Sequence, residues 1–161
     1  MALQKMKALH AHLDAAKLVG SNRLDSWMED GKLVPSQQRR GGGLMICQFQ
    51  YDAIFVLEAF HREPELLMAI VCAWLIEHDA ERDDQQLSPP SIDVDMVDEK
   101  SADVEINITF REDIELAEDP AGAITLRGKT YSIASLSPDV ASQVGVGDDP
   151  QQPTDAQWSA P

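Results

Sequence analysis

The chain has 161 residues, 43% of them hydrophobic and 25% charged, with 13 Lys and Arg against 28 Asp and Glu and a formal net charge of -15. This length fits one domain with or without a tail, since a self-sufficient core needs roughly 100 residues. The hydrophobic share is too high for a wholly disordered chain, and no apolar run approaches the roughly 20 residues that cross a bilayer. We therefore expect a soluble, partly globular protein with no membrane partner.

The charge is unevenly distributed. Residues 1–45 carry seven basic and four acidic residues, whereas 46–161 carry six basic and 24 acidic residues. Because nucleic-acid affinity depends on Lys and Arg that neutralise phosphates, this balance argues against specific nucleic-acid binding. The N-terminus has no apolar signal-peptide segment, and Cys47 and Cys72 lie within apolar segments. We expect buried, reduced thiols in a cytosolic compartment, with a single disulfide as the alternative.

The predicted elements begin with an amphipathic helix over residues 2–18, where apolar residues recur at every third or fourth position. A second, short helix is predicted before Gly31, with one apolar side made by Leu24, Trp27 and Met28. The stretch 35–43, PSQQRRGGG, has no apolar period and is predicted to be an exposed, flexible loop.

Two long apolar segments follow. From Leu44 to Phe60 apolar residues recur at every second position, which predicts a long strand. Residues 64–78, PELLMAIVCAWLIEH, are predicted to form a helix that begins at Pro64. This helix is apolar around most of its circumference, so we expect it to be covered on two sides, by the sheet and the first helix or by another subunit.

The C-terminal half is predicted to form strands and then a tail. After an acidic connector, residues 92–96 and 104–110 alternate strictly between apolar and polar, which predicts two antiparallel strands with one solvated face. A last strand is expected over 124–133, with a tight turn at Gly128-Lys129. Residues 135–161 hold four prolines and four acidic residues and are predicted to be a disordered, flexible tail. The predicted fold class is α+β, with a mixed or antiparallel sheet packed by two main helices within residues 1–134.

No pattern of catalytic or cofactor-binding residues is present. Carboxylates on the strands 92–96 and 104–110 could attract calcium, but the calcium-loop spacing is absent and a solvated acidic face is expected. There is no HExxH or Cys/His cluster and no GxSxG motif. The sequence RRGGG at 39–43 precedes a strand and lacks the Lys-Ser/Thr pair of a phosphate loop. We predict no catalytic residue, no metal and no cofactor, and thus a protein that is not an enzyme.

The segment 60–78, FHREPELLMAIVCAWLIEH, together with the strand before it and the strands after it, resembles the tail completion protein R family of contractile-tailed temperate bacteriophages. The resemblance covers roughly residues 3–134 and is most specific at Leu66, Leu67, Ala73, Trp74 and Leu75. It implies a structural virion protein, similar to a tail terminator, that caps the head-proximal end of the tail and makes it competent to join a head. The implied partners are further copies in a six-fold ring, the tube and sheath proteins and a neck or connector protein, with assembly in the host cytoplasm.

Four sets of residues are candidates for contacts in such an assembly. A subunit interface is expected at Met68, Cys72 and Ile76. A lumen that DNA passes through is expected to be approached by Asp103, Glu105, Asp113 and Glu115, whose charge would keep DNA from sticking; the alternative is that they keep an edge strand soluble. Arg39 and Arg40 are expected to dock on an acidic tube or sheath subunit. Trp158 is a candidate anchor of the tail, or the tail is an inert solubilising segment.

Two other functions are compatible with this sequence. The protein could act one ring nearer the capsid, in the neck or in head completion. As an acidic decoy it could instead occupy a host nucleic-acid-binding protein by imitating the spacing of phosphates. A decoy would act as a compact monomer, whereas a terminator must assemble.

Overall fold

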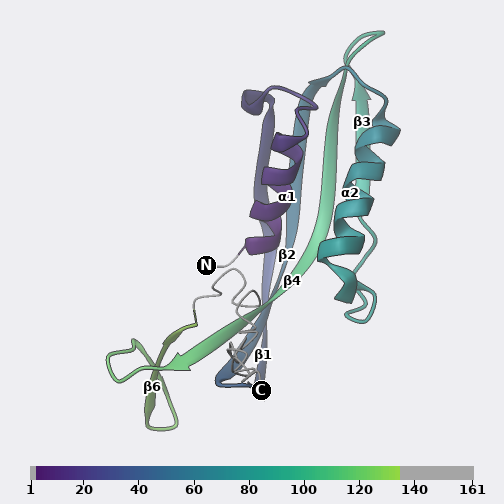
Figure 1. The fold of residues 1–161 in the computed structure, drawn as a ribbon. Coiled ribbons are helices and arrows are strands. Elements are labelled where there is room, and N and C mark those ends of the chain that lie inside the picture. The colour runs from purple at the N-terminus through teal and green to yellow at the C-terminus, as the bar shows by residue number, and fades with distance from the viewer. Residues whose placement is uncertain (1–2, 135–161) are drawn as a thin grey trace, which may run out of the picture.

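The computed structural model describes residues 3–134 and places two helices on one face of a long, twisted sheet (Figure 1). The elements in chain order are α1 (Gln4–Ala15), β1 (Leu24–Arg40), β2 (Gly43–Phe60), α2 (Pro64–His78), β3 (Ser91–Met96), β4 (Ala102–Glu118), β5 (Ile124–Leu126) and β6 (Lys129–Ile133). Every strand pairing in this part of the chain is antiparallel. The predicted α+β class, with a sheet packed by two main helices, is confirmed. The predicted tail and its anchor Trp158 lie outside the described residues.

Different strands complete the sheet at its two ends. β1, β2 and β4 run side by side over most of its length. At one end β3 pairs with Ala102–Asn107 of β4, and at the other end β6 pairs with Leu116–Glu118. Figure 1 shows that the second end extends past both helices. We call this extension, residues 32–48 and 113–133, the arm, and we call the remainder the helix-covered half.

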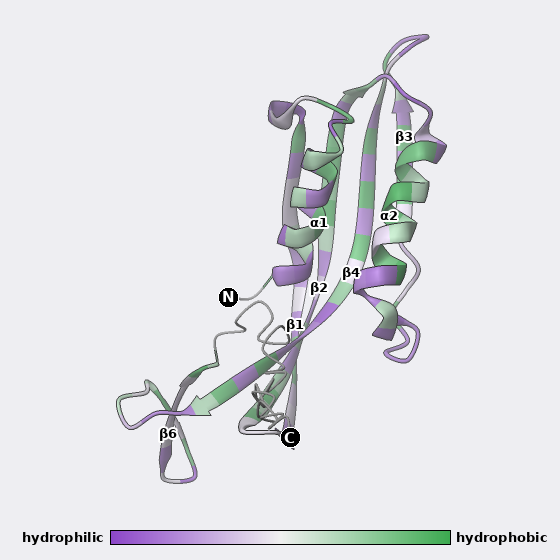
Figure 2. Cartoon of the chain, in the orientation of Figure 1, coloured by the Kyte–Doolittle hydropathy of each residue, from purple (hydrophilic) through white to green (hydrophobic). Residues whose placement is uncertain are grey.

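The core lies between the helices and the inner face of the helix-covered half. Tyr51, Phe55, Ile108 and Phe110 from the central strands are completely buried there. The helices contribute the buried side chains Leu9, Leu13, Leu67, Val71 and Trp74 to the same cluster. Alternate positions on β4 are hydrophobic and hydrophilic, and α2 is mostly hydrophobic (Figure 2). Burial of these side chains holds the helices on the sheet, since each large apolar side chain contributes about 1.5–3 kcal/mol.

A carboxylate from the sheet caps α1. Glu112 accepts hydrogen bonds from the backbone N–H groups of Gln4 and Lys5, at 3.0 and 2.9 Å. The Tyr51 hydroxyl donates to the same carboxylate at 2.6 Å. The first N–H groups of a helix have no partner within the helix and carry its positive dipole end, so a carboxylate stabilises them. Glu112 thereby fixes α1 on β4, a role that local sequence does not reveal.

A buried ion pair network links both helices. The Asp79 carboxylate, just after α2, lies 2.6 Å from Lys5 Nζ and 2.7 Å from Arg82 Nη1. The Asp79 side chain is completely buried, and Lys5 Nζ also donates to the carbonyl oxygen of Arg111 at 3.0 Å. A buried charge is costly unless it is paired, and here two cations and a backbone acceptor complete the network.

Two predictions for the N-terminal third are wrong. The residues expected to form a second helix, among them Trp27, are in strand β1, preceded only by a short 3₁₀ turn at Ser21–Arg23. The loop expected over 35–43 is also mostly strand, with Gly41 and Gly42 making the turn of the β1–β2 hairpin. Pro35 is tolerated because β1 is an edge strand. The positive φ of 54° at Gly41 suits glycine in a two-residue turn.

The other predicted elements are confirmed, with changes in length. The strand ending at Phe60, the helix 64–78 and the two alternating strands all form. β4 continues to Glu118, eight residues beyond its predicted end, and the expected last strand is the β5–β6 hairpin around Arg127 and Gly128. Within residues 3–134, no helix is both long enough and apolar enough to span a membrane.

Candidate interaction surfaces

The described residues hold no group of three or more His, Cys, Asp or Glu side chains that could bind a metal ion. Both cysteines in this region are free thiols. Cys47 is half-buried, and burial raises the pKa of its thiol. Cys72 is exposed on α2, so the prediction that both thiols are buried is wrong for Cys72. The surfaces described below are candidates for contact with other proteins.

The outward side of α2 is an apolar surface that residues 3–134 leave uncovered. Leu67, Val71 and Trp74 face the core and are buried, whereas Met68 and Ile76 are 36% and 74% exposed. Cys72 lies between these two and is also exposed. The helix is thus apolar on both sides but packed on only one. The three residues predicted to form a subunit interface do share one exposed surface.

A square of carboxylates lies on the uncovered face of the sheet, where β3 pairs with β4. Asp93 is directly opposite Glu105, and Asp95 is directly opposite Asp103. All four residues are exposed. Within residues 3–134, the side chains of three of them make no hydrogen bond or ion pair, while the Asp103 carboxylate accepts a hydrogen bond from the Ala59 N–H at 2.8 Å. Like charges directly opposite each other on neighbouring strands are destabilising, by about 0.2–1 kcal/mol.

The four residues predicted to approach a lumen share one face of β4 but not one environment. Asp103 and Glu105 belong to the carboxylate square in the helix-covered half. Asp113 lies in the arm, where its carboxylate is 2.7 Å from Arg40 Nη1 and accepts a hydrogen bond from Gln48 Nε2 at 2.8 Å. Glu115 also lies in the arm, opposite Met45. The negative charge of Asp113 is therefore already compensated within the chain.

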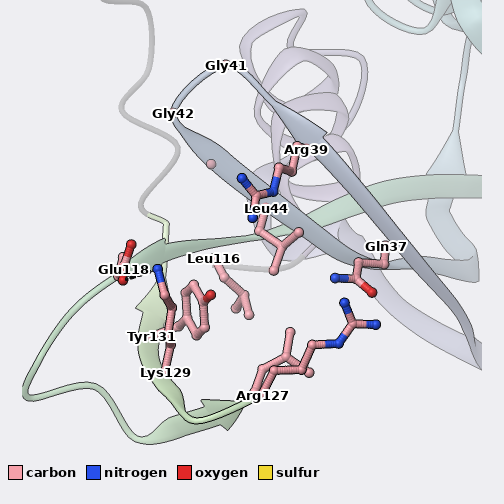
Figure 3. Close-up of a pocket in the computed structure, with 12 residues that line it drawn as sticks. Gln37, Arg39, Gly41, Gly42, Leu44, Leu116, Glu118, Arg127, Lys129 and Tyr131 are labelled. Atoms are coloured by element: carbon pink, nitrogen blue, oxygen red, sulfur yellow. Dashed lines mark ion pairs between the residues drawn. The ribbon is translucent and has the colours of Figure 1, made fainter.

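A basic hollow lies at the tip of the arm (Figure 3). It has a volume of about 290 Å³ and is formed by two hairpin turns, one at Gly41-Gly42 and one at Arg127-Gly128, together with the end of β4. Arg39, Arg127 and Lys129 line it, against the single acidic residue Glu118. Lys129 Nζ lies 2.9 Å from Glu118.

Two cations of this hollow are unpaired. Arg39 and Arg127 make no side-chain hydrogen bond or ion pair within the described part of the chain. The pKa of Lys129 is raised, first by its hydrogen bond to Glu118 and then by the charge of Glu118, and the nearby Arg39 opposes this shift. In a chain with a net charge of -15, a hollow with three cations and one carboxylate is exceptional. It is a surface suited to an acidic partner.

Arg127 adopts a backbone conformation that is unfavourable for arginine. Its φ is 49°, in the left-handed region, and it forms the first position of a two-residue turn in which Leu126 pairs with Lys129. Asn, Asp and Gly are the residues that favour this position. The cost for other residues is about 1 kcal/mol. A strained residue that directs a cation toward a hollow is a candidate for a contact role.

The two residues predicted to form a docking site have different surroundings in the structure. Arg40 forms an ion pair with Asp113, while Arg39 lines the hollow. Both residues lie at the end of strand β1. Arg127 and Lys129, which complete the hollow, were missed by the sequence prediction. The only local signal was a pair of cations around Gly128, and nothing in the sequence linked that turn to Arg39, about ninety positions earlier.

Comparison with known proteins gives two matches. The model of the family described as P2 phage tail completion protein R matches residues 3–135. A protein of Haemophilus phage HP1, described as an uncharacterized 19.2 kDa protein in the rep-hol intergenic region, is 31% identical over 125 residues. This alignment covers 75% of each protein. No solved structure matches the chain.

Proposed function

Since this chain belongs to the P2 phage tail completion protein R family, we propose that it completes the tail by capping the head-proximal end of its tube and sheath. The family is one of structural tail proteins, not of enzymes, so the chain is a structural component of the phage tail. The observation that carries the proposal is the extent of the family match, which spans residues 3–135 and thus every helix and strand described above.

Capping by geometry requires repeated copies of one small protein. We propose that the copies form a ring that matches the six-fold tail, with the outward side of α2 as a contact between subunits. The exposed Met68 and Ile76, on a helix whose opposite side is packed, support this because covering such a surface removes apolar area from water. The ring would then present one surface to tube and sheath and another to the neck protein, making the tail ready for head joining. Assembly would take place in the host cytoplasm.

Electron microscopy of particles made without this protein tests the proposed function. We expect tails of abnormal length that carry no head, because the tail end would be left open. Supplying the wild-type chain from a plasmid should restore tails of uniform length joined to heads. Tails of normal length beside unjoined heads would instead favour a neck or head-completion role. Unaltered particles would contradict both roles.

The proposed contact through α2 can be tested separately with Met68→Glu. A carboxylate in a covered apolar contact must be desolvated, so the variant should fail to form rings while remaining folded. Glu77→Gln, at a neighbouring exposed position of the same helix, is the matched control and should assemble normally. Rings of normal mass from Met68→Glu would show that this side of α2 is not the contact.

A further inference from the structure

We infer that the basic hollow at the arm tip of one copy binds the carboxylate square of the next copy, in a head-to-tail contact. This inference rests on the proposed ring but adds a second, polar contact to it. The hollow contributes Arg39, Arg127 and Lys129, and the square contributes Asp93, Asp95, Asp103 and Glu105. The partner is thus a second copy of this chain, identified by the complementary charge.

Each of the two surfaces carries charge that residues 3–134 leave uncompensated. Asp93 faces Glu105 across neighbouring strands, a pairing that costs stability in the isolated subunit. Arg39 and Arg127 face a hollow without an anion partner from residues 3–134. Contact between the two surfaces would pair both sets at once. Charge-assisted contacts of Arg with carboxylates are also the strongest class of side-chain hydrogen bond.

The two surfaces lie toward opposite ends of one long strand. β4 carries Glu105 of the square and Leu116 in the lining of the hollow. Eleven residues of extended chain separate them, a distance of roughly 35 Å. A single copy therefore cannot bring its own hollow onto its own square. Contact between unlike ends of identical chains is a heterologous contact, which produces a ring where the rotation closes.

The distribution of charge over the whole molecule agrees with this contact. The arm carries five basic and four acidic residues, a net charge of +1. The rest of residues 3–134 carries eight basic and 20 acidic residues, a net charge of -12. The helix-covered halves of two copies would repel each other, whereas the arm of one copy would not be repelled by the helix-covered half of the next. This difference favours head-to-tail over side-by-side association and guides the orientation of approach.

Arg127 supplies a further reason to assign a contact role to the hollow. A two-residue turn of this kind is better made with Asn or Gly, so the arginine lowers the stability of the isolated hairpin. The guanidinium makes no hydrogen bond or ion pair within the described residues that would offset this strain. Pairing with the carboxylates of another copy would offset it.

The test uses two charge-reversed chains. Each chain alone is expected to fail to rescue the phage, whereas the two chains together are expected to rescue it. The arm-reversed chain carries Arg39→Glu and Arg127→Glu; the face-reversed chain carries Asp93→Lys, Asp95→Lys and Glu105→Lys. None of these five side chains has an ion pair or hydrogen bond within residues 3–134, so both chains should fold. Asp103 is kept because it holds the Ala59 N–H. Circular dichroism and thermal midpoints verify folding, with Lys32→Glu and Glu58→Lys at exposed positions as matched control variants.

Each reversed chain alone should fail to rescue infectivity of a phage that lacks the wild-type protein. Like charges would meet at every contact, which lowers its affinity about a hundredfold or more. Co-expression of both reversed chains should restore infectivity, because an alternating ring pairs acidic arms with basic faces and basic arms with acidic faces. Six positions allow complete alternation. Rescue by either chain alone, or no rescue by the mixture, would overturn the inference.

Two further outcomes separate this contact from other roles of the same residues. If the hollow instead binds the acidic C-terminal segment, replacing Asp139, Asp148, Asp149 and Asp155 by Asn in the full chain would mimic the arm-reversed defect and overturn the inference. If Asp103 and Glu105 line a lumen, the face-reversed chain alone would assemble normally and fail at DNA passage, which also overturns the inference.

One outcome separates this contact from the proposed function. If loss of the protein left tail length unaffected and the mixture of reversed chains still restored infectivity, the contact would be supported and the tail-completion proposal would be contradicted.

Discussion

The helix-covered half and the arm are built from the same three strands but differ in what covers them. In the first, Tyr51, Phe55 and Phe110 are completely buried beneath α1 and α2. In the second, neither helix of the described residues covers the sheet (Figure 1), and Leu33 and Ile133 are 65% and 52% exposed. The comparison teaches that one continuous sheet can be packed beneath two helices at one end and extend beyond them at the other.

The polar interactions differ in the same way. In the helix-covered half, Asp79 and Glu112 are placed where they satisfy cations or helix N–H groups. In the arm, the pair between Arg40 and Asp113 is half-exposed, and Arg39 has no partner within residues 3–134. A half-exposed ion pair contributes little to stability, whereas a buried one is costly to break. Matched substitutions in the two regions should therefore have unequal effects.

The largest difference is expected for apolar truncation. Phe55→Ala removes a completely buried side chain and should lower the free energy of unfolding by about 3–5 kcal/mol. Leu33→Ala, in the arm, should change it by less than about 0.5 kcal/mol because the side chain is mostly exposed. Urea denaturation of both variants measures the difference. Equal losses would show that the arm is part of the core.

A smaller difference is expected for ion pairs. Asp79→Ala leaves Lys5 and Arg82 without their common carboxylate and should cost about 3 kcal/mol. Asp113→Ala breaks only the half-exposed pair with Arg40 and should cost about 0.5 kcal/mol. The same denaturation assay applies. A loss at Asp113 as large as that at Asp79 would contradict the division between the two regions.

High pH should weaken the helix-covered half through Tyr51. Burial, then the hydrogen bond to Glu112, raise the pKa of this hydroxyl above its ordinary value of 10.0, so the folded state favours the neutral form. Its contribution is fully present below pH 10 and is lost as the unfolded chain ionises above it, by about 1.4 kcal/mol at pH 11. Tyr51→Phe should remove that part of the loss in unfolding experiments between pH 9 and pH 11. An identical pH profile for both chains would exclude this cause.

The smallest effect is a predicted gain in the arm. Arg127→Asn places a residue that tolerates positive φ in the β5–β6 turn and should stabilise the chain by about 0.5 kcal/mol. The same change removes a cation from the hollow, so assembly should weaken while the subunit becomes more stable. Thermal melting and the mass of the assembly measure the two effects. A variant that melts lower and assembles normally would contradict the role given to Arg127.

The helix-covered half could be predicted from the sequence because its burial leaves a periodic signal. Alternation along Leu44–Phe60 and the apolar run of 64–78 predicted a strand and a helix that both form. The arm leaves no such signal, since β1 is an edge strand held by backbone hydrogen bonds to β2 and its side chains beyond Gly31 are mostly exposed. Leu24, Trp27 and Met28 also matched a helical spacing by chance.

A candidate surface could be predicted from the sequence only where its residues lie close together along the chain. Met68, Cys72 and Ile76 share one side of a single helix, so spacing alone placed them together. The hollow joins Arg39 to Arg127 and Lys129 through the pairing of β4 with β2 and β6, which no local pattern reveals. The capping of α1 by Glu112 was hidden for the same reason, because it spans more than a hundred positions.

Tail length in electron micrographs tests the central claim that folded copies of this chain end the tail by assembling on it. The phage lacking the protein would be supplied with wild type, with Met68→Glu, or with Glu77→Gln, each verified to be folded. The account predicts uniform, head-bearing tails with wild type and Glu77→Gln, and overlong tails without heads with Met68→Glu. Uniform, head-bearing tails in the phage supplied with no copy at all would contradict it.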